Sequence, residues 1–138
     1  MMALDLGDKR IGVATCDAGE VLATPLTTIQ HTKHQRDIQT ILALAVEQNV
    51  EQIVVGMPVS LSGDIGPQAK KAGRFAEKLA SQADIPVEVA DERYSTVDAQ
   101  RLLYEAGGHG FKDRGRIDSA AAAVILQYYI DSRRARTA

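Results

Sequence analysis

The hydrophobic pattern of this chain changes its period after Ile29, and this change limits the folds that the chain can adopt. Before Ile29 the apolar residues form short runs separated by turn-forming residues, which is typical of β-strands. After it, segments with apolar residues at helical spacing alternate with short apolar runs. A group of strands followed by alternating helices and strands predicts an α/β fold, in which helices flank a mixed sheet.

The first part of the chain predicts a meander of three antiparallel strands. We expect them at Ala3–Leu6, at Ile11–Cys16 and at Val21–Thr24, with the third continuing past Pro25 to Ile29. The turn-forming stretches GDK and DAGE separate the strands.

The second part predicts two strands that lie parallel within the same sheet. The run Ile53–Val55 is continuously apolar, as in strands covered on both faces, and ends at Gly56; the other strand is Val87–Ala90. The sheet is therefore expected to have five strands, three antiparallel and two parallel. The expected helices cover residues 38–45, begin at Pro67, run from Ser95 to the glycines at 107–108, and begin at Asp118.

The length and cysteine content fit an intracellular protein of one domain. The 138 residues suffice for a single domain, 1–138, with a full hydrophobic core. The single cysteine, Cys16, cannot form an intramolecular disulfide, which suits a reducing compartment. The sequence shows neither a signal peptide nor an apolar stretch long enough to cross a membrane. We expect a cytoplasmic protein with no membrane partner.

The charge balance argues against a uniformly basic surface, because the formal net charge is −2. The bases are instead clustered, which leaves local nucleic-acid binding open. Aromatic residues make up only 4% of the chain, so we expect recognition through backbone and shape rather than through base stacking.

Three acidic residues stand where an acid is costly or where ligands gather. Asp5 interrupts a strand, and burying an unpaired carboxylate costs several kcal/mol or more. Glu92 lies just beyond the strand that ends at Ala90, and Asp118 opens the expected final helix. Because ligands of α/β sheets bind beyond the carboxyl ends of parallel strands, these three acids are candidates for one site.

Carboxylates that converge in this way repel one another unless a cation lies between them. Mg²⁺ and Mn²⁺ prefer oxygen ligands, and two such ions can activate water and stabilise the leaving oxygen in phosphodiester cleavage. We therefore predict a two-metal site in which Asp5 bridges both ions, while Glu92 and Asp118 each complete one side.

Each acid also has a simpler interpretation. Asp118 is suited to cap a helix, and Glu92 is suited to pair with Arg93 or Lys78 at the surface. Asp5 would be tolerated in a short edge strand that faces water.

Several basic residues are candidates for phosphate contacts near these acids. Lys9 and Arg10 follow the Asp5 strand, either to hold a nucleic-acid backbone or as part of a solvated turn. Lys70 and Arg74 share one helix face with Lys78, which is either a binding face or only the wet side of the helix. The remaining candidates are Arg93, Lys112, Arg114 and Arg116. His31 and His34 have ligand-like spacing, but without further Cys or His nearby we expect no zinc site there.

The segments that carry these residues resemble a known family. LDLGDKRIGVA, VVGMPVSLSGDIG, VADERYST and RIDSAAAAVILQYYI are similar, in order and over nearly the whole chain, to the motifs of the YqgF/RuvX family. The resemblance implies a ribonuclease H-like fold, and it places the family's acidic positions at Asp5, Glu92 and Asp118. It also implies a nuclease, described either as acting on pre-16S rRNA or as resembling Holliday junction resolvases.

We therefore expect a metal-dependent nuclease that acts in 5′-end maturation of 16S rRNA. The alternatives are a nuclease for branched DNA, a non-catalytic binder in ribosome assembly, and a phosphotransferase of the actin and sugar-kinase type. The last requires two such domains to enclose ATP, and the chain has room for one. The expected partners are nucleic acid and ribosome-assembly proteins, and the chain is compatible with a monomer or a homodimer.

Overall fold

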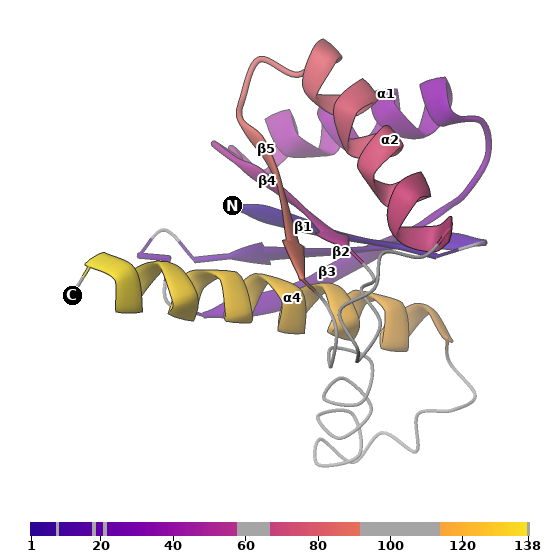
Figure 1. The fold of residues 1–138 in the computed structure, drawn as a ribbon. Coiled ribbons are helices and arrows are strands. Elements are labelled where there is room, and N and C mark those ends of the chain that lie inside the picture. The colour runs from indigo at the N-terminus through magenta and orange to yellow at the C-terminus, as the bar shows by residue number, and fades with distance from the viewer. Residues whose placement is uncertain (8, 18, 21, 58–66, 92–113, 138) are drawn as a thin grey trace.

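In the part of the chain that the structure describes, a mixed sheet lies between two helices on one side and one helix on the other (Figure 1). The computed structural model describes residues 1–7, 9–17, 19–20, 22–57, 67–91 and 114–137. Within these ranges, no helix combines the length and the apolar character that crossing a lipid bilayer requires. The predicted helix that starts at Ser95 lies outside the described residues, as do Glu92, Arg93 and Lys112.

The described residues form a sheet of five strands in the order β3-β2-β1-β4-β5. Strands β1 and β2 pair antiparallel, as do β2 and β3, whereas β4 runs parallel to β1 and to β5. The predicted mixed sheet is therefore confirmed. The strands are β1 (Met2–Leu6), β2 (Arg10–Cys16), β3 (Ala23–Gln30), β4 (Ile53–Met57) and β5 (Val87–Asp91).

At two positions, hydrogen-bonded pairing within the sheet determines whether a strand continues through a residue that does not favour strands. The predicted end of β4 at Gly56 is wrong, because Gly56 is buried and pairs with Ala90, so the ladder to β5 continues through it. The predicted passage of β3 through Pro25 is confirmed. Proline is tolerated there because β3 is an edge strand and Pro25 lies at a register irregularity next to Val13 and Ala14.

Helices α1 (His34–Glu47) and α2 (Pro67–Gln82) cover one face of the sheet (Figure 1). The buried residues of α1, Ile38, Ile41 and Ala45, follow the predicted helical spacing. They form one core with side chains of β1 and β2, which include Leu4 and Ile11. Helix α2 adds Phe75, Ala76 and Leu79 to this core. Pro67 occupies the first helical position, as predicted.

Helix α4 (Arg114–Thr137) covers the opposite face (Figure 1). Its Ile125, Leu126 and Ile130 pack against Ala3 of β1 and Val54 of β4. Neighbouring residues of β1 thus serve different cores, since Leu4 belongs to the α1–α2 side. At the later part of this helix Tyr128 is 57% exposed, whereas its neighbour Tyr129 packs on the core.

The start of α4 differs from the prediction. The sequence placed Asp118 at the opening of the helix, but α4 begins at Arg114, so Asp118 lies inside it. Asp118 is therefore not an N-cap. A capping preference is worth about 1 kcal/mol, which is less than the packing of a long helix along a sheet provides.

Candidate functional site

Asp5 and Asp118 meet at one glycine of the sheet. Asp5 in β1 pairs with Gly12 in β2. A β-carbon on Gly12 would lie 2.0 Å from the carbonyl oxygen of Asp118 and 2.4 Å from its carbonyl carbon. The backbone of α4 at Asp118 therefore lies directly on Gly12, an approach that only glycine permits. Two acids 113 positions apart thus flank the same residue.

The carboxylate of Asp5 belongs to the α4 side of the sheet. Side chains alternate along a strand, and Ala3, two residues before Asp5, packs against α4. Leu4 and Leu6 instead belong to the α1–α2 core. Cross-strand partners present their side chains to the same face, and the α4 backbone lies on that face of Gly12. Asp5 and Asp118 are therefore neighbours on one face.

The position of Asp5 excludes its simpler interpretation. Strand β1 lies at the centre of the sheet, between β2 and β4, and Asp5 is half-buried. An edge strand facing water is therefore wrong. A carboxylate placed between strands at this depth is costly unless charges or hydrogen bonds stabilise it.

Arg10 forms an ion pair with Asp118 across this site. Its Nε donates a hydrogen bond to Oδ2 of Asp118 at 2.9 Å, and both side chains are about one-quarter exposed, at 24% and 25%. Arg10 is the first residue of β2, so the alternative of a solvated turn is wrong for this residue. A charge-assisted hydrogen bond fixes the orientation of the carboxylate to which it is donated. Arg10 therefore positions Asp118.

The third predicted acid follows the sheet edge at which Asp5 lies. Leu4 pairs with Val55, and Val55 pairs with Val89, so β1, β4 and β5 run side by side towards the same edge. Strand β5 ends at Asp91, directly before Glu92 in sequence. Glu92 itself lies outside the described residues.

The donors present at the site suit a hard divalent cation. Asp5 and Asp118 offer carboxylate oxygens, the ligand type that Mg²⁺ and Mn²⁺ prefer. Among the described residues, no group of three or more His, Cys, Asp or Glu side chains is arranged to hold a metal ion. The two described acids thus fit part of the predicted ligand set, for which Glu92 is the remaining member.

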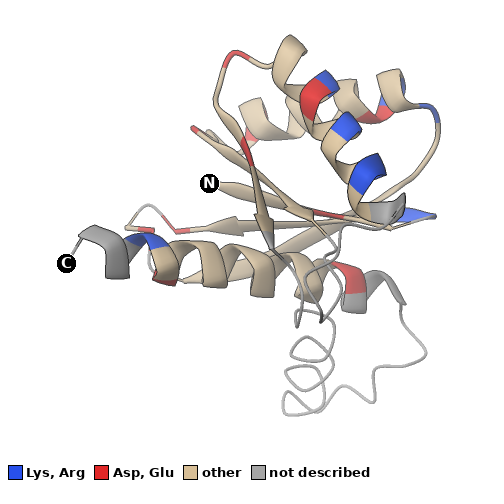
Figure 2. Cartoon of the chain, viewed as in Figure 1, with Lys and Arg blue, Asp and Glu red and all other residues tan. Residues whose placement is uncertain are grey.

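The predicted phosphate-binding residues lie in different parts of the structure. Lys9 is exposed beside the start of β2, and Lys70 is exposed on α2. Arg74 lines a cavity on the α1–α2 side of the sheet. Arg114 and Arg116 belong to the start of α4, where the structure describes the backbone alone. Figure 2 shows basic positions recurring along α2, whereas the middle of α4 carries none.

Sequence reasoning missed two features of this region. One is the role of Gly12, for which a glycine inside a predicted strand was the available signal. The other is the cavity, which His31, His34 and Lys71 also line. Helical spacing selected Lys70 because it lies four residues before Arg74, but Lys71, three residues before Arg74, shares its face as well.

Comparison with known proteins places the chain in a family. A family model described as "RuvX: Holliday junction resolvase" matches residues 1–132. The chain belongs to the RuvX family. Several curated relatives carry the name "Putative pre-16S rRNA nuclease". The relative from Crocosphaera subtropica is 42% identical over 134 residues, which cover 97% of this chain and 94% of the relative. The relative from Synechocystis is 44% identical over 133 residues, which cover 96% and 88%.

Solved structures support the fold of this RuvX-family chain. RuvC from Thermus thermophilus, in complex with a Holliday junction substrate, matches with a TM-score of 0.59 at 15% identity and covers 97% of this chain and 96% of that one. The fowlpox virus resolvase, also in complex with Holliday junction DNA, matches with a TM-score of 0.55 at 10% identity and covers 96% and 99%. At such identities the likeness concerns the fold, and the expected ribonuclease H-like architecture agrees with it.

Proposed function

We propose that this protein is a metal-dependent nuclease that hydrolyses phosphodiester bonds and acts at the 5′ end of pre-16S rRNA. The observation that carries the proposal is the meeting of Asp5 and Asp118 on one face of the sheet across Gly12. The names of the relatives from Crocosphaera subtropica and Synechocystis support RNA as the substrate.

In this proposal, Asp5, Asp118 and Glu92 hold Mg²⁺ or Mn²⁺ in a two-metal site. Bound divalent ions activate water and stabilise the leaving oxygen in phosphodiester hydrolysis. The residues of the chain supply the geometry. Gly12 lets α4 approach β2 closely, which brings Asp118 to the face of the sheet on which Asp5, the cross-strand partner of Gly12, lies. Arg10 keeps the carboxylate of Asp118 in a fixed orientation.

The basic residues near the acids would hold the substrate rather than take part in the reaction. Lys9 lies beside Arg10 at the same end of the β1–β2 hairpin and is exposed, so it would be accessible to the phosphate backbone of a substrate. Arg93, Lys112, Arg114 and Arg116 are near Glu92 or Asp118 in sequence and are proposed to contact flanking phosphates. Such contacts orient a strand without reading its bases.

A second candidate function is cleavage of branched DNA. The family description names a Holliday junction resolvase, and this is the specific observation that favours it. The two functions share one chemical site and differ in the nucleic acid that is presented to it.

One experiment separates these functions. The purified protein is incubated with Mn²⁺ or Mg²⁺ and one of three substrates: RNA that contains the 5′ end of 16S rRNA with its precursor extension, unrelated single-stranded RNA, or a four-way DNA junction. We expect cleavage of the precursor RNA, and none with EDTA. Preferential cleavage of the junction would establish the second candidate instead.

Two variants test the site itself. Asp5→Asn keeps the size of the side chain and removes its charge, and it should abolish cleavage while the protein stays folded. Asp84→Asn is the matched control, because Asp84 is exposed in the turn between α2 and β5. Cleavage that survives Asp5→Asn would overturn the proposed metal site, and binding of all three substrates without cleavage would identify a non-catalytic binder.

A further inference from the structure

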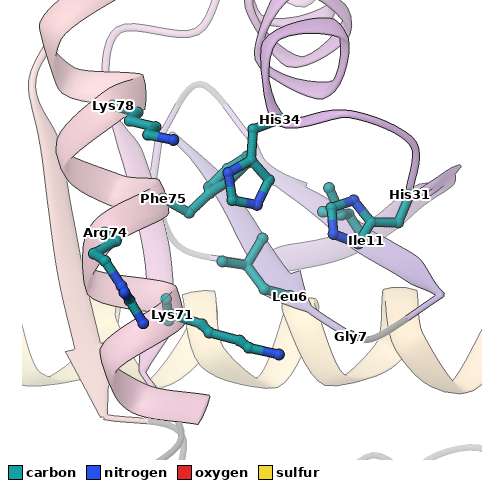
Figure 3. Close-up of a pocket in the computed structure, with 10 residues that line it drawn as sticks. Leu6, Gly7, Ile11, His31, His34, Lys71, Arg74, Phe75 and Lys78 are labelled. Carbon is teal, nitrogen blue, oxygen red and sulfur yellow. The ribbon is translucent and has the colours of Figure 1, made fainter. Parts of the chain in front are cut away.

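A second site lies on the opposite side of the sheet from Asp118. A cavity of about 380 Å³ opens between α2, the end of β1 and the segment that leads into α1 (Figure 3). This volume lies in the range of sites that bind small molecules, about 300 to 1,000 Å³. The described residues that line the cavity include no acid.

One wall of the cavity is cationic. Lys71, Arg74 and Lys78 line it, and their spacing of three and four residues places them on one face of α2. Figure 3 shows all three side chains on the α2 wall, with His34 and His31 across from them. All three are exposed, so they remain accessible to a ligand. Three cations on one wall favour a phosphorylated ligand.

The opposite wall carries two imidazole rings that the fold holds in place. The rings of His31 and His34 are nearly parallel, with centroids 5.9 Å apart and an angle of 14°. His34 meets Phe75 edge-on at 5.6 Å. Nδ1 of His31 is hydrogen-bonded to Oδ2 of Asp37, which is 1% exposed and also accepts hydrogen bonds from Thr32. A buried carboxylate thus fixes the ring of His31.

The floor of the cavity is apolar. Leu6 and Ile11 line it beside Phe75. A flat apolar group that enters the cavity would therefore meet aliphatic side chains below and aromatic or imidazole rings at its side. A cationic wall beside an apolar floor and ring faces matches the two parts of a nucleotide, its phosphate and its base.

The position of the cavity relates it to the proposed active site. Leu6 and Gly7, which line it, come directly after Asp5 in β1. Asp5 belongs to the α4 face of the sheet, whereas Leu6 belongs to the α1–α2 face. A nucleic-acid strand that crosses the sheet at the carboxyl end of β1 would therefore reach both the acids and the cavity.

We propose that this cavity binds one nucleoside monophosphate unit, with its phosphate against Lys71, Arg74 and Lys78 and its base against His34, Phe75 and the apolar floor. The proposal rests on the proposed function in one respect, namely that the unit belongs to the strand that is cleaved at Asp5 and Asp118. It deepens that function by assigning a binding site to one nucleotide of the substrate, on the far side of the sheet from the acids.

The test measures binding without cleavage. Fluorescence anisotropy follows a labelled single-stranded RNA decamer in EDTA over a range of salt concentrations. The combined change Lys71→Ala, Arg74→Ala and Lys78→Ala should weaken binding at least about tenfold and reduce the slope of log K against log salt by about 0.7, because the three cations hold one phosphate and single strands lose about 0.7 per phosphate contact. Arg36→Ala, in an exposed residue of α1 that does not line the cavity, should leave both quantities unchanged.

Single changes give a sharper comparison. Lys71→Ala should weaken binding more than Lys70→Ala, because Lys71 lines the cavity and its neighbour Lys70 does not. His34→Ala should weaken binding of the intact decamer, but it should change binding of a fully abasic decamer much less. Equal effects of Lys70→Ala and Lys71→Ala, together with a combined variant that binds as the wild type does, would overturn the proposal.

A titration with free uridine monophosphate tests whether the cavity binds a free nucleotide or only a nucleotide within an RNA strand. Titration followed by NMR should shift signals of His34 and Lys71 at millimolar concentrations if the unit is recognised by itself. Binding of the decamer alone, still weakened by the combined variant, assigns the cavity to a nucleotide within a strand. Absence of any effect of the combined variant on either ligand contradicts the proposal in both forms.

Failure of this proposal is distinguishable from failure of the proposed function. If the combined variant loses binding and no substrate is cleaved by the wild type, the cavity binds nucleotides and the nuclease proposal is wrong. If the wild type cleaves RNA and the combined variant cleaves it with unchanged KM, the nuclease proposal stands and the cavity proposal is wrong.

Discussion

Nε of Arg10 lies 2.9 Å from Oδ2 of Asp118, and this contact joins the first residue of β2 to the inside of α4 across 108 positions of sequence. The same strand holds Gly12, on which the backbone of Asp118 rests. Two residues near the start of β2 therefore determine where Asp118 lies and how its carboxylate is oriented. Asp5 on β1 is the cross-strand partner of one of them, Gly12.

Removal of the Arg10 side chain should affect activity more than stability. The pair with Asp118 is partly exposed, so Arg10→Ala should lower the free energy of unfolding by no more than about 1 kcal/mol. A misplaced carboxylate costs more in catalysis, so kcat/KM for RNA cleavage should fall at least about tenfold. Urea unfolding and cleavage kinetics measure the two effects. Arg10→Lys should restore activity only in part, because a lysine cannot reproduce the Nε hydrogen bond. Full activity of Arg10→Ala would contradict the positioning role.

Gly12→Ala should destabilise the protein by about 3 kcal/mol or more. The added β-carbon would lie 2.0 Å from a backbone oxygen of α4, so the helix must move away from the sheet. Gly73→Ala is the matched control, because its β-carbon would meet only the Met57 side chain, at 3.8 Å, within a helix. That change should stabilise the protein by about 0.5 to 1 kcal/mol. Thermal unfolding of both variants measures the difference, and similar stabilities would contradict the close approach of α4.

Asp37→Asn should destabilise the protein at neutral pH and much less in acid. Burial by itself raises the pKa of Asp37, but hydrogen bonds from Thr32 and the interaction with His31 outweigh it, so the pKa lies below its ordinary value of 3.8. The unfolded chain then binds the proton more readily than the folded one, and stability falls as the pH drops from about 3.8 through the lower folded pKa.

We expect Asp37→Asn to cost about 1 to 3 kcal/mol at pH 7, since it weakens a buried hydrogen-bond network. The difference from the wild type should shrink towards pH 3, as measured by urea unfolding at several pH values. Glu47→Gln, at the exposed end of the same helix, should show no such dependence. A difference that stays constant with pH would show that the charge of Asp37 does not stabilise the fold.

Metal binding should be detectable without any substrate. A cation that binds only the folded state raises the melting temperature in proportion to the logarithm of its concentration above Kd. Millimolar Mn²⁺ should therefore raise the Tm of the wild type and of Asp84→Asn, but not that of Asp5→Asn or Asp118→Asn. Equal shifts in all four proteins would assign the bound ion to a place other than the acids.

The sequence by itself determined most of the architecture. The meander, the two later strands and the helical spacing of α1 and α2 are local patterns, and each corresponds to an observed element. Asp5 was also recognisable, because an acid inside an apolar strand requires stabilisation that the strand does not offer. Local preferences failed where pairing or packing was stronger, as at Gly56 and at the start of α4.

Only the tertiary structure decided which residues meet. The apolar residues of β1 and β4 are buried on both faces, so their pattern does not reveal which helix covers which side. The contact of Asp118 with Gly12 and Arg10, and the inclusion of Lys71 rather than Lys70 in the cavity, follow from how α4 and α2 dock on the sheet. The packing of these helices on the sheet depends on many weak contacts between segments that are distant in sequence. No short stretch of residues determines it.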